Sequence, residues 1–422
     1  MQPFKLNRNT SNITARQAEV NTTVTEQVRE ILTDIKTNGD PAIRKYIERF
    51  DGYTGQHLLV TPEEIAAGVR AAGDDFMRIL QRACEQITEY HANQIEKSWG
   101  MYKDNGVIMG QLVRPLSRVA LYVPGGTAAY PSTVLMNAIP AQLAGVTDIA
   151  IFTPVKADGK VPDVILAAAA CCGIHEIYKI GGAQAVAAAA YGTASIKKAD
   201  KIVGPGNIYV ATAKQLVYGT VGIDAIAGPS EILIIADETA NPVYIAADML
   251  SQAEHDELAS AILVTTCEKI IEETEAELAS QLEKLPRKET AEASLKNYGA
   301  AILAANLEEA FAISNELAPE HLEILTANPL DKLPMVKNAG SIFLGEHTPE
   351  PLGDYMSGTN HVLPTGGTAK FSSPLGVYDF VKYSAYSYYP GNVLAEFADD
   401  VIKFAELEGL DAHANSVRVR MK

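Results

Sequence analysis

Cysteine is scarce in this sequence, with only Cys84, Cys171, Cys172 and Cys267 among 422 residues. The adjacent pair at 171 and 172 lacks the C-x-x-C spacing of zinc and redox motifs, so we expect reduced thiols without a catalytic role. Long apolar runs are missing too. No stretch reaches the roughly 20 apolar residues that cross a bilayer, and residues 1–20 have no signal-peptide core.

Positive charge is also in short supply. The chain has 35 Lys and Arg against 52 Asp and Glu, which gives a formal net charge of −17. Such a surface repels phosphate backbones and anionic lipids, so we expect neither nucleic acid nor membrane as a partner. The hydrophobic content of 47% is ordinary for globular proteins. These features predict a cytoplasmic globular protein with a small-molecule ligand.

What is present is a regular alternation of short apolar runs and alanine-rich stretches. We expect a parallel sheet with helices on both faces, because this alternation is typical of βαβ units. Its predicted strands are 119–123, 148–152, 177–180 and 201–203, and its predicted helices are 132–144, 161–171, 182–191 and 207–216.

The same alternation starts again after residue 230. The predicted strands are 231–236, 261–265, 301–303 and 322–325, and the predicted helices are 241–254, 267–285 and 307–316. The fold class is therefore α/β, with two similar, incomplete Rossmann-like domains of parallel sheet. We expect the helical segment 25–93 to pack on the second sheet and residues 377–422 to form helices.

These expectations give a division of the chain. It consists of an N-terminal arm (1–20), a discontinuous domain (21–115 and 230–375), a second α/β domain (116–229) and a C-terminal helical tail (376–422). The long connection 348–374 within the discontinuous domain is a functional hint, because such segments usually line a site.

Three strands of the first α/β unit run straight into glycine, in segments 122–126, 180–184 and 203–207. In a parallel sheet these loops gather at one edge, where backbone amides and helix N-termini favour phosphate. One such loop could merely turn strand into helix, but three, beside Tyr122, Gln184 and Asn207, favour a nucleotide. No G-x-G-x-x-G fingerprint is present, so the ligand is either a dinucleotide held unusually or another phosphate compound.

Two further groups of residues carry chemistry. Gln252 and His255 stand one helical turn apart, and with Asp354 and His413 they make a nitrogen-and-oxygen ligand set that suits Zn²⁺. Sequence spacing does not show that these four meet, and a polar helix terminus facing solvent would also explain the first two. In the second group Glu320 and His321 are neighbours at a helix-to-strand junction, where the imidazole could accept a proton and the carboxylate could activate water. The other histidines are interpreted as surface or core residues: His57, His91, His175, His347 and His361.

From about residue 20 to residue 420 the sequence resembles the histidinol dehydrogenases. The motifs that carry the resemblance are Tyr-Val-Pro-Gly-Gly (122–126), Gly-Gly-Ala-Gln-Ala (181–185), Gly-Pro-Gly-Asn (204–207), Ala-Gly-Pro-Ser-Glu (227–231), Ser-Gln-Ala-Glu-His-Asp (251–256), Ala-Pro-Glu-His-Leu (318–322), Gly-Asp-Tyr (353–355), Gly-Thr-Asn-His-Val-Leu-Pro-Thr (358–365) and Glu-Gly-Leu-Asp-Ala-His (408–413).

The resemblance implies an NAD-dependent, four-electron oxidation of L-histidinol to L-histidine through bound histidinal, the last steps of histidine biosynthesis. By that resemblance one Zn²⁺ is held by Gln252, His255, Asp354 and His413 and orients the substrate. His321 is then the general base and Glu320 activates water. NAD contacts Tyr122, Gln184 and Asn207, and histidinol contacts Ser230, His321 and Glu408 as well as the metal ligands.

The resemblance also implies an intertwined homodimer, in which Glu408 and His413 complete the partner's site. One alternative is a zinc and NAD dehydrogenase of the same fold that oxidises another alcohol, such as a sulfonated diol. Glu408 disfavours it, because a carboxylate suits an amine and repels a sulfonate. A zinc hydrolase and a binding protein without activity are alternatives from other classes.

Overall fold

The computed structural model describes residues 5–10, 22–125, 129–226 and 228–421. Most of the expected arm 1–20, together with Gly126 and Ala227 of two motifs, lies outside the described residues. The chain forms two compact units. The first comprises Met1–Gln94 and Leu116–Phe380, and the second comprises Ile95–Pro115 and Val381–Lys422.

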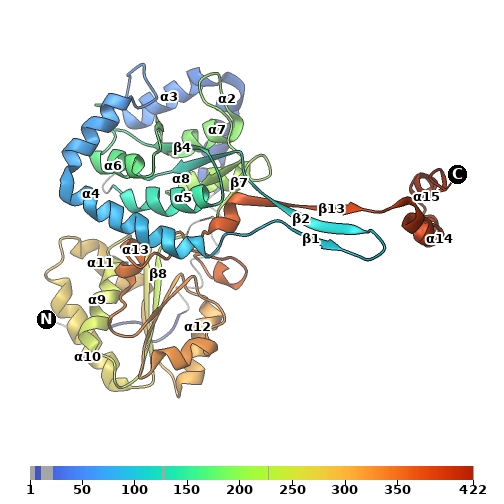
Figure 1. Ribbon diagram of the computed structural model, residues 1–422. Helices are drawn as coiled ribbons and strands as arrows, with labels where there is room; N and C mark the ends of the chain where they lie inside the picture. Colours follow the sequence, from blue (N-terminus) through green and yellow to red (C-terminus); the bar gives the residue numbers. More distant parts are fainter. Residues whose placement is uncertain (1–4, 11–21, 126–128, 227, 422) are drawn as a thin grey trace. The chain divides into compact units, whose positions relative to one another are not determined.

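The first unit contains two parallel five-stranded sheets (Figure 1). One has the order β5-β4-β3-β6-β7, and its strands are β3 (Arg118–Tyr122), β4 (Asp148–Thr153), β5 (Glu176–Lys179), β6 (Lys201–Val203) and β7 (Gly222–Ile223). Strand β3 is buried at every position, as expected for a central parallel strand covered on both faces.

Two helical layers cover this sheet, each with its own apolar core. One layer is formed by α2 (Thr22–Asn38), α3 (Asp40–Asp51), α7 (Gly182–Tyr191) and α8 (Ile208–Val217), and the other by α4 (Pro62–Ala92), α5 (Pro131–Leu143) and α6 (Asp163–Cys171). Alternate residues of β3 point into the two cores, with Ala120 in one and Leu121 in the other.

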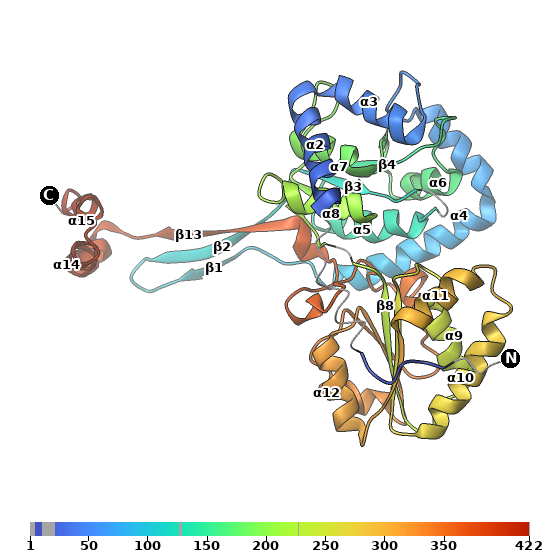
Figure 2. The same cartoon turned by 180° about the vertical axis from the view of Figure 1, so that it is seen from behind.

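The second sheet has the order β10-β9-β8-β11-β12. Its strands are β8 (Glu231–Ala236), β9 (Ser260–Thr265), β10 (Gly299–Leu303), β11 (His321–Leu325) and β12 (Ser341–Leu344). Helices α9 (Pro242–Ala253), α10 (Glu268–Leu282) and α11 (Lys288–Tyr298) pack on one face, and α12 (Leu307–Leu317) packs on the other (Figure 2).

Numbered within each sheet, both strand orders read 3-2-1-4-5, which is the 3-2-1-4-5-6 order of a Rossmann fold without its sixth strand. The predicted α/β class with two similar, incomplete Rossmann-like sheets is therefore confirmed. The strands and helices that the sequence predicts after residue 116 end within about three residues of the observed bounds.

The prediction that residues 25–93 pack on the second sheet is wrong. Helix α2 contributes Val28 and Ile35 to the core that contains Ala120 and Phe152 of the first sheet. On the opposite face, Ile87 of α4 packs with the residues of α5 and α6. The hydrophobic period of these helices predicts a buried face, but it does not identify the sheet that the face covers.

The second unit consists of an antiparallel sheet and two helices, α14 (Gly391–Leu407) and α15 (Asp411–Arg418). The sheet has the order β1-β2-β13, with β1 (Trp99–Tyr102), β2 (Ile108–Pro115) and β13 (Val381–Tyr388). The prediction that residues 377–422 are all helical is therefore wrong for 381–388. The aromatic residues Tyr383, Tyr386 and Tyr388 favour a strand, and antiparallel pairing with β2 satisfies the backbone groups along one of its edges.

The short link between the two parallel sheets determines which of their edges lie close together. The chain leaves the carboxyl end of β7 at Ile223 and enters the amino end of β8 at Glu231, eight residues later. A link of that length spans at most about 28 Å. The carboxyl edge of the first sheet and the amino edge of the second therefore lie in one region. Among the described residues, no helix is long and apolar enough to cross a membrane.

Candidate active site

Glu320 and His321 are buried at the amino end of β11, at the edge of the second sheet where its strands begin. Helix α12 ends at Leu317, and Ala318 takes a left-handed conformation with φ of 51°. This turn and the following proline stop the helix and send the chain into the strand. The predicted helix-to-strand junction is thus present, and it places a carboxyl group and an imidazole at the strand entrance.

The backbone of Glu231 holds both side chains. Its N–H donates to Oε2 of Glu320 at 2.9 Å, and its carbonyl oxygen lies 2.9 Å from Nδ1 of His321. Because a carbonyl can only accept a hydrogen bond, Nδ1 carries the proton and Nε2 keeps its lone pair. The side chain of Glu231 in turn accepts the N–H of Gly366 at 3.2 Å, which ties the long loop to this edge.

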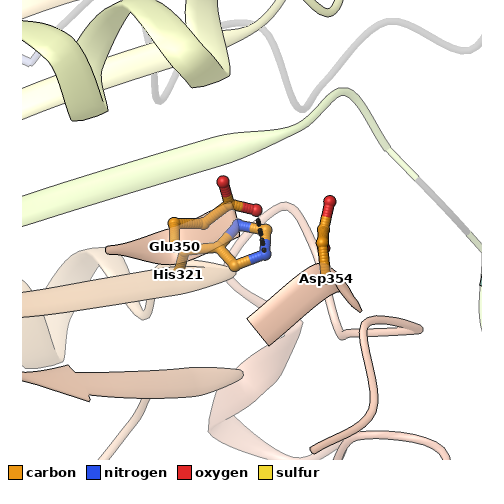
Figure 3. A group of neighbouring side chains, drawn as sticks. All are labelled: His321, Glu350 and Asp354. Atoms are coloured by element: carbon orange, nitrogen blue, oxygen red, sulfur yellow. Dashed lines mark ion pairs between the residues drawn. The ribbon is translucent and has the colours of Figure 1, made fainter. Parts of the chain in front are cut away.

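A short helix, α13 (Glu350–Tyr355), brings two carboxyl groups toward the imidazole (Figure 3). Oε1 of Glu350 lies 3.5 Å from Nε2 of His321. Asp354 follows one turn later, and one side-chain oxygen or nitrogen from each of the three residues lies within 4.8 Å of the others. On its other side Asp354 is 3.6 Å from Nδ1 of His361.

Burial determines the protonation states of this group. It lowers the pKa of His321 to about 4, which leaves the imidazole neutral at pH 7. Burial and the charge of Asp354 raise the pKa of Glu350 to about 8. The pKa of Glu320 is raised well above its usual value by burial and by repulsion from Glu231, Asp354 and Glu350.

Asp354 behaves in the opposite way. Burial acts to raise its pKa, but the hydrogen bond and charge of His361, with the fields of His321 and His255, outweigh burial and leave the pKa below the usual value. Asp354 is therefore the carboxylate of this group that stays ionised most readily. An ionised, partly buried carboxylate is a suitable ligand for a cation.

Gln252 and His255 lie at the end of α9, next to this group. Gln252 is 1% exposed, and its Oε1 has no hydrogen-bond partner among the described residues. Nδ1 of His255 lies 2.8 Å from the carbonyl oxygen of Ser251, so Nδ1–H donates and Nε2 keeps its lone pair. The charge of His255 acts on the pKa of both His321 and Asp354, which places it nearby.

The direction of Gln252 follows from Asp248, one turn earlier on α9. The carboxyl groups of Asp248 and Glu323 interact, and the charge of Asp248 contributes to the raised pKa of Glu350. Residues four apart share one helix face. Gln252 therefore also points toward β11 and α13.

These residues fit a divalent cation. Gln252 offers a buried oxygen that has no partner in the described part of the chain, His255 the lone pair of Nε2, and Asp354 an ionised carboxylate. The donors are nitrogen and oxygen without sulfur, which is a common set for a catalytic zinc or a similar metal. A dication would also offset the mutual repulsion of the buried carboxyl groups.

The candidate nucleotide residues lie at the carboxyl edge of the other sheet, where their loops gather as predicted. The hydroxyl of Tyr122 accepts the N–H of Gly182 at 3.0 Å, next to Gln184 in the first turn of α7. The loop after β6 passes against the backbone of Tyr122 and reaches Asn207, which is exposed and caps α8. The roles of Tyr122, Gln184 and Asn207 stay predictions.

The remaining predicted site residues fall in two places. Ser230 is half-buried and immediately precedes Glu231. Glu408 ends α14 and His413 lies on α15, and both are exposed in the second unit. The roles assigned to these three residues also stay predictions.

Sequence reasoning missed Glu231, Glu350 and His361. The interpretation of His361 as an ordinary surface or core residue is wrong, because its ring faces Asp354. One signal was available for His361, which sits in the motif 358–365 inside the long connection. Glu350 had no such signal, because it stands in a Pro-Glu-Pro context without another ionisable residue within two positions.

A substitution at Gln252 separates metal binding from folding. We predict that Gln252→Leu leaves the metal-free protein as stable as the parent or more so, because it removes an unsatisfied buried oxygen. Metal content after zinc loading and desalting should fall from about one ion per chain to a small fraction.

Gln94→Leu is the matched control. It loses the hydrogen bonds to Val377 and His91 and should cost about 1–3 kcal/mol in urea unfolding. Full metal uptake by Gln252→Leu would contradict the assignment.

The lowered pKa of His321 predicts an acid-dependent loss of stability. Its folded-state pKa lies below the unfolded value of 6.5, so this stability is present above pH 6.5 and is lost as the pH falls toward 4. Between pH 7 and pH 5 the loss amounts to about 2 kcal/mol. We compare proteins from which metal has been removed by chelation. From pH 7 to pH 5 the free energy of unfolding of His321→Asn should fall by about 2 kcal/mol less than that of the parent. The exposed His347→Asn should match the parent, and equal slopes in all three proteins would refute the pKa shift.

Comparison of the sequence with known proteins identifies a family. The family model described as histidinol dehydrogenase matches residues 14–421. The chain is 63% identical over 407 residues to the histidinol dehydrogenase of Lactococcus lactis subsp. lactis, covering 96% of this chain and 94% of that protein. It is 55% identical over 407 residues to the enzyme of Clostridium acetobutylicum, with the same coverage of both chains.

A solved structure agrees with the sequence comparisons. The crystal structure of histidinol dehydrogenase from Elizabethkingia anophelis superposes with a TM-score of 0.93 at 38% identity, covering 100% of this chain and 98% of that one. These comparisons give no support to the alternative of a sulfonated-diol dehydrogenase. The chain belongs to the histidinol dehydrogenase family.

Proposed function

We propose that this protein oxidises L-histidinol to L-histidine in the cytoplasm, with two molecules of NAD each taking a hydride in turn. The observation that carries the proposal is the buried, neutral His321 beside Glu320, within reach of a set of donors that fits a metal. The relatives named above are histidinol dehydrogenases, which supports this substrate over other alcohols.

His321 has the form that a general base needs. Its Nδ1–H is fixed on Glu231, so the lone pair of Nε2 can take the hydroxyl proton as hydride leaves the carbon. A buried imidazole with a pKa of about 4 is a weak base by itself. The ionised carboxylate of Asp354 stabilises the imidazolium that forms, as a carboxylate does beside a catalytic histidine.

Glu320 is suited to activate water for the second oxidation. Its Oε2 is held by the backbone of Glu231, which leaves Oε1 to accept a proton from water. The resulting hydroxide adds to the aldehyde carbon and gives the gem-diol as its singly ionised anion. A second hydride then leaves this diol for NAD, with a proton passing to His321, and the product is a carboxylate.

We assign the metal to Gln252, His255, Asp354 and His413, and we propose that it is Zn²⁺. When bound, it supplies a fixed positive charge that orients the substrate and favours its deprotonated oxygen. Substrate contacts are assigned to these ligands and to Ser230, His321 and Glu408, because a carboxylate at 408 suits the substrate's ammonium group.

The dinucleotide is assigned to the carboxyl edge of the first sheet, with Tyr122, Gln184 and Asn207 as contacts. Helices α7 and α8 begin there, and the positive ends of their dipoles favour the pyrophosphate. The short link from Ile223 to Glu231 supports this assignment, because hydride transfer needs the nicotinamide close to the alcohol carbon.

We also propose a homodimer in which Glu408 and His413 complete the partner's site. An exposed apolar row on α14 supports a partner there: Phe397, Val401, Phe404 and Leu407 are 46%, 43%, 67% and 77% exposed. Residues at this spacing line one side of a helix, and such rows commonly mark a protein interface.

Glu320→Gln should separate the two half-reactions. Reduction of histidinal by NADH uses no water, whereas oxidation of histidinal by NAD requires its hydration. We predict that Glu320→Gln slows the oxidation by about 10²-fold or more and changes the reduction by less than tenfold. His321→Asn should slow both directions. Nicotinamide absorbance measures both rates, and equal losses in the two directions for Glu320→Gln would disprove its role in hydration.

Mixed dimers test the shared site. Glu320→Gln and His413→Ala should each be inactive for histidine formation. Refolding equal amounts together should give about half heterodimers, each with one intact site, and therefore about a quarter of the parental activity. Each variant refolded alone is the control. Mass spectrometry of the intact complexes should show the heterodimer, and its presence without activity would contradict tail exchange.

A further inference from the structure

Lys214 is a buried charge that the proposed chemistry does not use. It lies on α8, and its side chain is 3% exposed among apolar residues such as Val210 and Val217. It forms an ion pair with Asp224, whose side chain is 4% exposed just after β7. Burying two charges costs desolvation free energy that is recovered only if the pair makes further hydrogen bonds. The other contacts of this pair are therefore informative.

Both members of the pair bind the same glycine. Nζ of Lys214 donates to the carbonyl oxygen of Gly204 at 2.9 Å, and the N–H of Gly204 donates to Oδ2 of Asp224 at 2.7 Å. The loop after β6 is thus held from both sides by charge-assisted hydrogen bonds, which are stronger than neutral ones.

The conformation of Gly204 shows how closely the loop is fitted. Its φ is +112°, and a Cβ atom there would lie 2.1 Å from the carbonyl oxygen of Tyr122. Only glycine adopts this conformation so close to another backbone. The loop therefore rests directly on the end of β3, beside one of the three assigned dinucleotide contacts.

The loop leads into a second assigned contact. Asn207 follows three residues after Gly204, and its Oδ1 accepts the N–H groups of Tyr209 and Val210 at 3.1 and 3.2 Å. Lys214 lies two turns further along the same helix. The contacts of Lys214 and Asn207 therefore connect α8 to both ends of the segment 204–207.

We propose that Lys214 and Asp224 are a positioning pair for the dinucleotide. They hold segment 204–207 in the shape that presents Asn207 and the start of α8 to NAD, without touching the cofactor themselves. This inference rests on the proposed function, since it concerns NAD affinity. It predicts a loss that is specific to NAD and does not extend to histidinol or to the chemical step.

The test compares two buried ion pairs of the same sheet. Lys214→Met removes the positioning pair. Arg118→Met removes a pair at the amino end of β3, where Arg118, with a 6% exposed side chain, binds Glu176 at 2.6 Å. That end of the strand is opposite the dinucleotide edge, so Arg118→Met is the matched control for the loss of a buried pair.

Both variants should have a lower Tm. At a temperature where circular dichroism shows both folded, Lys214→Met should raise the KM for NAD about tenfold. Its kcat and its KM for histidinol should stay within about twofold of the parent, because only cofactor binding is weakened. Arg118→Met should leave all three constants within about twofold. Equilibrium dialysis with NAD alone checks the change in affinity without turnover.

Asp224→Asn is the second variant, for use also if Lys214→Met does not fold. It keeps an oxygen for the N–H of Gly204 but loses the charge that Lys214 needs, so it too should raise the KM for NAD. Lys214→Arg should recover part of the affinity. An unchanged KM for NAD in Lys214→Met or in Asp224→Asn, or an equal rise in Arg118→Met, overturns the inference alone. Failure of the parent protein to bind NAD would overturn the proposed function together with it.

Discussion

The backbone of Glu231 is the contact on which the rest of the site depends. Its N–H binds Glu320 and its carbonyl accepts from His321, so one residue fixes both candidate catalytic side chains. The parallel pairing of β8 and β11 sets this arrangement, because it places His321 opposite Ile232. Mutation of the Glu231 side chain would leave these two backbone contacts available. The geometry is therefore a property of the sheet register rather than of a replaceable side chain.

The reactivity of this site depends on the charges of the carboxyl groups around it. Six carboxyl groups gather around this edge of the sheet, from Glu231, Asp248, Glu320, Glu323, Glu350 and Asp354. Their burial and mutual repulsion raise several of the pKa values, which is unfavourable for ionisation unless a cation is present. A divalent metal and a positively charged substrate would both relieve this repulsion. Burial, in contrast, keeps the imidazole of His321 neutral and able to accept the protons that two oxidations release.

The candidate NAD loops and the candidate catalytic pair lie at opposite kinds of sheet edge. Ligands of open α/β sheets usually bind at the carboxyl ends of strands, and the candidate NAD loops follow this rule. The candidate catalytic pair does not, because it lies at the amino end of β11. The short connection from β7 to β8 reconciles the two positions, since it brings a carboxyl edge and an amino edge into one region.

The sequence predicted most of the parallel strands, because glycine and alanine mark their ends clearly, but it missed β7 and β12, which are edge strands. It failed where the partner of a segment is distant in sequence. Helix α2 has a clear apolar face, but nothing in its period names the sheet that the face covers. Strand β13 was interpreted as helix because its pairing partner β2 lies more than 260 residues earlier.

The site shows the same limit. The neighbouring pairs Glu320 with His321 and Gln252 with His255 were visible as local patterns. Glu350 was not, since only folding brings it to 3.5 Å from His321. His413 lies in a separate unit of the chain, and sequence spacing alone does not connect it to the other proposed ligands.

The most direct test of this account is the product balance of the purified, zinc-loaded protein with L-histidinol and excess NAD. Chromatography should show histidine formed from histidinol, and absorbance should show two molecules of NADH for each histidine, with no free histidinal accumulating. One NADH per histidinol with release of the aldehyde, or no NADH at all, would contradict two oxidations at one buried Glu320–His321 site.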